Sequence, residues 1–286
     1  MPTDHHLQLR QWFQPELPGP LVWWHVVRTG CGRCLVDRWP SPHTVIAETA
    51  GNYSLRGDPT HLDDQPEPIA GFVEAPEVFL PELRRLDPDL HIWERLVLAL
   101  NGDTRCPPKP AAVVRRLTET DTDALADLAE GISWISKTHG GPAGLAASEL
   151  GWGAFSAGRL ASVAVPFFIG EDHEDLGVVT ERAFRGRGFS TACAAAVVAD
   201  VRSRGRRPTW TTSLSNVASL SVARRLGFRA IREDQLYIVR TPRLQVRTTE
   251  CTLRRTIGCL GNVDPMVAGS VGRVSQGPPH PGGVPG

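Results

Sequence analysis

The sequence has little that would place it in a membrane or cross-link it. Its longest apolar run, roughly residues 160–169, is about half the length needed to span a bilayer. The chain does not open with a charged segment followed by an apolar stretch, so we expect no secretory signal. Six cysteines in 286 residues do not suggest a disulfide framework. We therefore expect a cytoplasmic protein with reduced thiols and no membrane partner.

The charge balance also lacks an excess of either sign. The 31 basic and 31 acidic residues cancel, and no segment is basic enough to favour nucleic acid as a partner. Apolar residues make up 41% and charged residues 22% of the chain, which excludes a wholly disordered, collagenous or coiled-coil protein. A chain of 286 residues is about twice the usual size of one domain, so the length favours two domains.

Two breaks in composition suggest where these domains begin and end. Residues 106–110 contain three prolines in four residues, which disfavours a continuous helix or strand and predicts a linker. Residues 258–286 contain 8 glycines and 5 prolines and show almost no apolar periodicity. Such a segment cannot bury enough surface to offset its ordering entropy. We predict an N-terminal accessory domain over 1–108, a catalytic domain over 109–245 and a flexible, disordered tail over 246–286.

Strand and helix patterns alternate clearly through the second predicted domain. Strands are expected at 113–117, 152–155, 160–168, 175–180, 208–213 and 228–239, and helices after the capping residues 120–123, after residue 188 and over 216–226. The first 108 residues give weaker signals, which are strands at 23–27 and 44–48 and a helix near Pro81. This order predicts an α/β (α+β) layered fold in which helices cover a mixed sheet.

The segment RGRGFS, residues 185–190, lies between an expected strand and an expected helix. Gly186 and Gly188 let the backbone approach a ligand closely, and the helix start supplies free N–H groups and a positive dipole end. Arg185 and Arg187 add charged donors, so the segment suits a phosphate or pyrophosphate. A Walker loop is excluded because no lysine follows, and a dinucleotide fingerprint because the third glycine is missing. An ordinary turn with solvated arginines stays open.

A second motif follows about 30 residues later. Asn216 precedes an expected helix that ends at Leu226-Gly227-Phe228. Together the two motifs resemble the GNAT superfamily of acyl-CoA-dependent N-acyltransferases, over roughly residues 112–240. The glycine motif of that family is [QR]-x-x-G-x-[GA], and here Ser190 stands at its last position. The resemblance implies a GNAT-like, mostly antiparallel sheet flanked by helices.

The resemblance also implies a site for acetyl-CoA as co-substrate, with no metal. By that resemblance, the main chain of residues Val178, Val179 and Thr180 would bind the pantetheine arm. The pyrophosphate would be bound by the glycine turn and helix start, and the family places Asn216 beside the arm near the thioester. The implied pyrophosphate residues are Arg185, Gly186, Arg187, Gly188, Phe189, Ser190 and Thr191. An N-cap is an equally good interpretation of Asn216, and both roles are compatible.

The acid–base residues are harder to assign. The family often uses a carboxylate near the start of the strand before the glycine turn, which points to Glu174 as general base, although a charged run such as EDHED also suits a solvated loop. Many members carry a tyrosine seven residues after the Asn, where this chain has Ala223. Tyr237 is a substitute acid, as are the hydroxyls of Ser219 and Ser221.

We therefore expect an N-acetyltransferase in which an amine attacks the acetyl thioester directly within a ternary complex. The acceptor amine is a small molecule or a peptide that the sequence does not identify. Two alternatives stay open. One is a catalytically impaired CoA-binding regulatory module, which Ala223 would favour, and the other is a phosphate-binding α/β protein unrelated to CoA. Residues 1–108 would be a degenerate GNAT-like half or a substrate-recognition cap. Cys31 and Cys34 lack a second ligand pair, so we predict no metal site there.

Overall fold

The computed structural model describes residues 3–64, 67–104 and 110–241. Within these ranges, eleven strands form one sheet in the order β1-β2-β3-β4-β11-β5-β10-β9-β8-β7-β6. The strands are β1 (Arg33–Val36), β2 (Thr44–Thr49), β3 (Asn52–Gly57), β4 (Gly71–Glu74), β5 (His91–Ala99), β6 (Val113–Arg116), β7 (Trp152–Ser156), β8 (Arg159–Ile169), β9 (His173–Thr180), β10 (Arg207–Ser213) and β11 (Arg229–Val239). The predicted tail, 246–286, lies outside the described residues.

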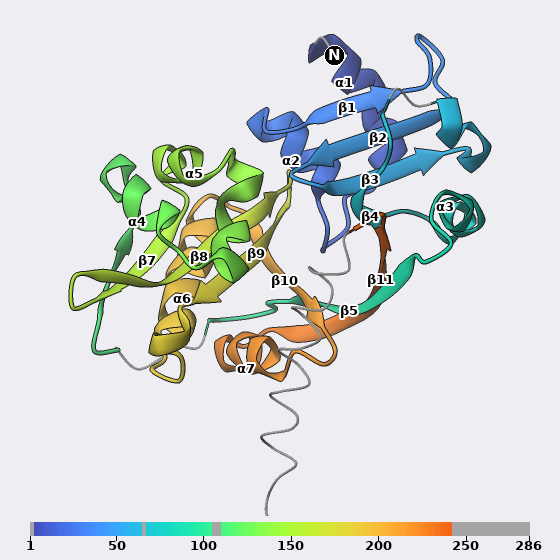
Figure 1. Ribbon diagram of the computed structural model, residues 1–286. Helices are drawn as coiled ribbons and strands as arrows, with labels where there is room; N and C mark the ends of the chain where they lie inside the picture. The colour runs from blue at the N-terminus through green and yellow to red at the C-terminus, as the bar shows by residue number, and fades with distance from the viewer. Residues whose placement is uncertain (1–2, 65–66, 105–109, 242–286) are drawn as a thin grey trace, which may run out of the picture. The chain divides into compact units, whose positions relative to one another are not determined.

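Among the described residues, two neighbouring strand pairs of this sheet run parallel, β3–β4 and β9–β10, and the others run antiparallel. The mixed, mostly antiparallel sheet predicted from the sequence is therefore confirmed. Strand β5 lies between β10 and β11, so a strand from the first 108 residues pairs on both sides with strands from the second half (Figure 1). The sheet thus continues across the predicted boundary at residue 108, and residues 1–242 group into one unit. A separate accessory role for residues 1–108 stays a prediction.

Helices cover both faces of the sheet. They are α1 (Thr3–Leu9), α2 (Val22–Thr29), α3 (Leu80–Leu86), α4 (Thr122–Ala126), α5 (Pro142–Ser148), α6 (Phe189–Ser203) and α7 (Val217–Leu226), with a 3-10 segment, η5 (Glu130–His139). Residues of α6 and α7 share one apolar core with β9 and β10, whereas α4, η5 and α5 pack with β8 in another. No helix among the described residues is long and apolar enough to cross a bilayer.

Most of the elements expected in the second half form where the sequence places them. Gly158, with a φ of 75°, turns the hairpin between β7 and β8, and Gly227, with a φ of 102°, ends α7. The helix expected after residues 120–123 is shorter than its apolar pattern indicates. It ends at Ala126, and the chain continues through η5 as a 3-10 helix.

The strand predicted at 23–27 is wrong, because these residues belong to helix α2. Trp23, Trp24 and Val26 are buried, and His25 between them is buried as well, so burial over these few residues does not mark a single helical face. A short apolar run is compatible with a buried strand or a buried helix. In the structure the segment is a helix that ends at Gly30. Gly30 adopts a left-handed conformation and donates its N–H to the Val26 carbonyl, as is common at helix C-termini.

Residues of the N-terminal segment form hydrogen bonds with the turn that connects β8 to β9. The Glu16 carboxylate accepts hydrogen bonds from the main-chain N–H groups of residues 171–173 and from the ring of His173. Burial acts to raise the pKa of Glu16, but these hydrogen bonds hold it below its ordinary value. His25 of α2 accepts from the Ile169 N–H at 3.1 Å. Residues 16 and 25 thereby fix the connection from β8 into β9.

Candidate active site

Strand β9 leads into the glycine turn and then into helix α6, as the sequence predicts. Gly186 and Gly188 have φ values of 77° and 79°, a left-handed conformation that favours glycine. Gly188 is also the N-cap residue of α6, and no side chain caps the helix start. A Cβ built on either glycine would meet no atom within 4 Å. The turn therefore presents bare backbone to open space at the start of a 15-residue helix.

The main-chain donors of this turn have no protein partner. Among the described residues, none accepts a hydrogen bond from the N–H groups of residues 186–191, and Ala192 is the first to donate back, to Gly188. Free N–H groups at a helix start and the positive end of its dipole form an anion site. These are the donors assigned to the pyrophosphate on the sequence, and the structure brings them together.

Strands β9 and β10 are paired only where they begin. The pairing runs through His173–Arg207, Glu174–Pro208 and Asp175–Thr209, and stops there. After this point the edge of β9 that faces β10 has no strand partner in the described structure, while its other edge pairs with β8 as far as Thr180. The main chain of residues 176–180, which includes Val178 and Val179, therefore has an open edge that leads to the glycine turn.

Asp175 lies at the position where the two strands part. Its side chain points to the face opposite α6, because Leu176 and Trp210 occupy the core beneath α6 and α7, and side chains alternate along a strand. The hydroxyls of Thr209 and Thr211 donate to its Oδ1 at 2.7 and 3.0 Å. The residue is 5% exposed, and burial raises the pKa of Asp175 to about 6. A carboxyl group with this pKa can gain and lose a proton near neutral pH.

Arg95 and Asp234 add charges near Asp175. Arg95 lies on β5, is almost fully buried, and forms an ion pair with Asp234 of β11. The positive charge of Arg95 acts to lower the pKa of Asp175, and the negative charge of Asp234 acts to raise it. The Nε of Arg95 is buried and has no hydrogen-bond partner among the described residues. A polar group built from four strands thus surrounds the end of the β9–β10 pairing, and sequence reasoning missed it.

Glu174, the base suggested by the sequence, forms ion pairs with two arginines. Its carboxylate is fully buried on the α6 side of the sheet. Arg204 donates to Oε2 at 2.6 Å, and Arg206 donates to Oε1 at 2.6 Å. This double ion pair joins the start of β9 to the end of α6. This geometry does not favour the base role suggested by the sequence, because both carboxylate oxygens are buried and accept from guanidinium groups, and that role stays a prediction.

Asn216 caps helix α7, as expected. Its side-chain oxygen accepts a hydrogen bond from the Ser219 N–H at 3.1 Å, and the residue is exposed beside the end of β10. The Ser219 hydroxyl accepts a hydrogen bond from the indole N–H of Trp210 at 2.9 Å and keeps its own O–H as a donor. Ala223 is fully buried in the core shared by α6 and α7. The structure therefore supplies no proton donor from position 223.

Tyr237 is not brought to this site. It pairs with Ile92 of β5 and Val73 of β4, whereas β10 pairs with β5 only from Arg95 to Ala99. The ring is 2% exposed and packs in a separate core with α3. Burial also raises the pKa of Tyr237, which weakens it as an acid. The acid role suggested for Tyr237 therefore conflicts with its position.

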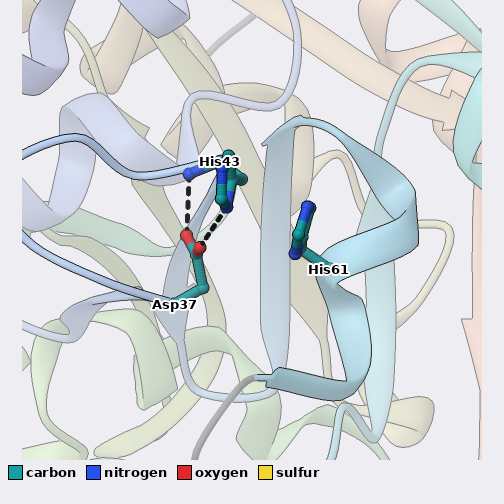
Figure 2. Close-up of side chains that lie close together, drawn as sticks. All are labelled: Asp37, His43 and His61. Atoms are coloured by element: carbon teal, nitrogen blue, oxygen red, sulfur yellow. Dashed lines mark hydrogen bonds and ion pairs between the residues drawn. The ribbon is translucent and has the colours of Figure 1, made fainter.

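A cluster of metal-ligand residue types lies elsewhere, on the N-terminal half of the sheet (Figure 2). Asp37, His43 and His61 bring ligand-type atoms within 4.8 Å of one another. Asp37 accepts hydrogen bonds from the ring and the main chain of His43. The two imidazole rings stack with centroids 3.9 Å apart and planes 15° apart. Lone pairs that lie in nearly parallel, stacked rings do not converge on one ion, so we assign no metal to this cluster.

Comparison with known proteins now identifies the class of the protein. A family model described as GNAT acetyltransferase matches residues 109–237. An uncharacterized N-acetyltransferase in the mutA 5′ region of Streptomyces virginiae is 41% identical over 213 residues, which cover 70% of this chain and 87% of the relative. The chain belongs to the GNAT superfamily and is an N-acetyltransferase of the acyl-CoA-dependent type.

Solved structures of the same family share the fold. A GCN5-related N-acetyltransferase-like protein from Streptococcus suis aligns with a TM-score of 0.64 and 17% identity, over 82% of this chain and 98% of its own. A GNAT-family acetyltransferase from Colwellia psychrerythraea aligns with a TM-score of 0.55 and 14% identity, over 83% and 96%. Both matches extend well beyond residues 109–237, so the fold of the first half is also found in other proteins of this class.

Proposed function

We propose that this N-acetyltransferase uses acetyl-CoA as donor and transfers the acetyl group to an amine by direct attack within a ternary complex. The observation that carries the proposal is the end of the β9–β10 pairing at Asp175 and Thr209. A carboxyl group with a raised pKa lies at that place, and an open main-chain edge runs from there along β9 toward the anion site at the glycine turn. Together they would hold a phosphorylated thioester and accept a proton beside it.

The donor would lie along β9 and end at the glycine turn. The main chain of Val178, Val179 and Thr180 would pair with the amide groups of the pantetheine arm as an added strand. The pyrophosphate would accept hydrogen bonds from the free N–H groups of residues 186–191, with the Arg185 side chain adding charge. The open space at the Cβ position of both glycines is compatible with a ligand close to this backbone.

Asp175 replaces Glu174 in our proposal as the general base. The neutral amine attacks the thioester carbonyl carbon and forms a C–N bond. The ammonium proton then passes to the ionised Asp175, directly or through a water molecule, and the C–S bond breaks to release the CoA thiolate. Burial and the hydroxyls of Thr209 and Thr211 place this carboxylate where its pKa, about 6, suits the transfer at neutral pH.

The leaving thiolate would take its proton from solvent. Ala223 offers no donor, and Tyr237 lies in a different core. Asn216 is exposed beside the end of β10, where its amide could orient the donor while its oxygen caps α7. A CoA thiolate is a tolerable leaving group, so the reaction does not depend on a strong acid at this point.

Residues 1–108 would contribute to the acceptor side of the site. Arg95 comes from this part of the chain and lies in the polar group around Asp175. Glu16 holds the turn that precedes β9. We therefore propose that the N-terminal half takes part in acceptor recognition, in addition to extending the sheet.

Incubation with acetyl-CoA and a panel of amines tests the proposal. Release of CoA thiol should depend on the amine, and mass spectrometry should find an N-acetylated product. Initial rates with both substrates varied should give intersecting double-reciprocal lines, as expected for a ternary complex, because parallel lines indicate a covalent acyl-enzyme. Binding of acetyl-CoA without transfer to any amine would instead support a regulatory CoA-binding module.

A further inference from the structure

Four arginines surround the glycine turn without being neutralised. Arg159 lies at the tip of the β7–β8 hairpin, Arg182 in the 3-10 turn η6 (Arg182–Phe184), and Arg185 and Arg187 in the glycine turn. All four are exposed. In the described part of the chain, no carboxylate lies within 4.0 Å of any of them, although many other arginines of the protein are paired with acids.

Two of these arginines converge on one aromatic ring. The guanidinium carbon of Arg159 lies 5.8 Å from the ring centroid of Phe184, and that of Arg187 lies 5.4 Å from the same centroid. Phe184 packs in turn against Phe189 at the start of α6, with ring centroids 6.3 Å apart. A guanidinium group held over an aromatic face keeps its N–H donors available at the ring edge. The ring thus holds two charges from separate elements near the anion site.

The number of positive charges exceeds what a pyrophosphate needs. The free N–H groups of the turn, with Arg185 beside them, already provide an anion site for that group. CoA carries a further phosphate monoester on its ribose, and such a group has a charge of about −1.5 to −2 at pH 7. We propose that Arg159 and Arg187, gathered on Phe184, bind the 3′-phosphate of CoA, so that the protein discriminates CoA from dephospho-CoA. This inference rests on the proposed use of acetyl-CoA.

Calorimetry with CoA and with dephospho-CoA tests this assignment, because the two ligands differ only in the 3′-phosphate. The wild type should bind CoA at least about tenfold more tightly, as one or two charged hydrogen bonds would provide. Arg159→Gln should weaken CoA binding by about tenfold and leave dephospho-CoA binding unchanged, so that the ratio of the two affinities moves toward one. Arg187→Gln should act in the same direction.

Arg28→Gln is the matched control, because Arg28 is also exposed and has no acidic partner but lies at the end of α2. It should leave both affinities as they are. Adenosine 3′,5′-bisphosphate should also bind the wild type, and Arg159→Gln should weaken it. Equal weakening of CoA and dephospho-CoA by Arg159→Gln, or no weakening of either, would overturn the 3′-phosphate site. Failure of the wild type to bind either ligand would instead overturn the proposed function.

Discussion

Asp175 of β9 and Thr209 of β10 form the last pair of the parallel contact between these two strands, and the Thr209 hydroxyl donates to the Asp175 carboxylate at 2.7 Å. One residue pair therefore marks both where the two strands separate and where a carboxyl group with a raised pKa is held. The same position is the end of the open edge of β9 that leads to the glycine turn. This coincidence is the basis of the catalytic proposal.

Asp175→Asn should lower turnover by about 10²–10⁴-fold, the usual contribution of a general base. Affinity for acetyl-CoA should change little, because the donor site lies further along β9. In the wild type, kcat/KM should rise as the pH increases through about 6, since Asp175 must be ionised to accept the proton. In the Asp175→Asn variant, kcat/KM should no longer rise through pH 6. Its remaining pH dependence should be that of the acceptor amine. Turnover equal to that of the wild type would remove Asp175 from the mechanism.

Glu174→Gln should act on stability instead. Removing one partner of a buried ion pair costs about 3–5 kcal/mol, and here Arg204 and Arg206 would lose their shared carboxylate. Urea denaturation should show a lower free energy of unfolding, whereas the pH profile of kcat/KM should keep its shape. Asp172→Asn is the control, because its pair with Arg207 is exposed and should contribute less than about 1 kcal/mol. Loss of turnover without loss of stability would restore Glu174 as the base.

The contrast between residues 174 and 175 shows how far the sequence could predict the site. The strand, the glycine turn and the N-cap at Asn216 follow local rules, and they form as expected. The choice between two adjacent carboxylates depends on which face of β9 the helix α6 covers. That information comes from packing, because side chains of neighbouring residues point to opposite faces of a strand.

Long-range pairing and burial account for what the sequence did not predict. The insertion of β5 between β10 and β11, which brings Arg95 to Asp175, joins segments more than 100 residues apart. The segment 23–27 is too short for its pattern to distinguish a buried strand from a buried helix, and it forms part of α2. Arg159 has no local motif, and only the fold of the β7–β8 hairpin brings it to Phe184.

His25→Gln should remove the loss of stability that protonation of His25 causes in the wild type at low pH. His25 is fully buried, and burial lowers the pKa of its ring to about 4, so the folded protein holds it neutral. The neutral His25 ring contributes fully to the free energy of unfolding above its unfolded pKa of about 6.5. This contribution is lost as the pH falls toward 4, which changes the free energy of unfolding by about 3 kcal/mol. The raised pKa of Asp175 makes stability change with pH in the opposite direction over the same range. The effect of His25 is therefore measured as the difference in unfolding free energy between the variant and the wild type.

The stability lost through His25→Gln should therefore be large at pH 7.5 and much smaller at pH 4.5. Urea midpoints for both proteins across this range measure it. His5→Gln serves as the control, because His5 is partly exposed and stacks on Trp39 near the chain start. A stability difference that is constant with pH would mean that protonation of His25 does not oppose folding.

Binding of acetyl-CoA to Gly188→Asp, compared with Gly205→Asp, tests the central claim most directly, because it requires no knowledge of the acceptor. Both glycines have left-handed φ values, 79° and 76°, and open space at the Cβ position, but they lie at opposite ends of α6. Both substitutions place a side chain in a left-handed conformation, and the helix dipole makes a carboxylate less costly at residue 188 than at residue 205, so a loss of binding confined to Gly188→Asp would not reflect lower stability. At residue 188 the new carboxylate would occupy the anion site and repel the pyrophosphate. Calorimetry should show that Gly188→Asp loses several kcal/mol of binding free energy, about 1.5–3 for each charged hydrogen bond lost, while Gly205→Asp binds like the wild type. Equal affinities of all three proteins for acetyl-CoA would contradict the account, because the glycine turn would then not bind the donor.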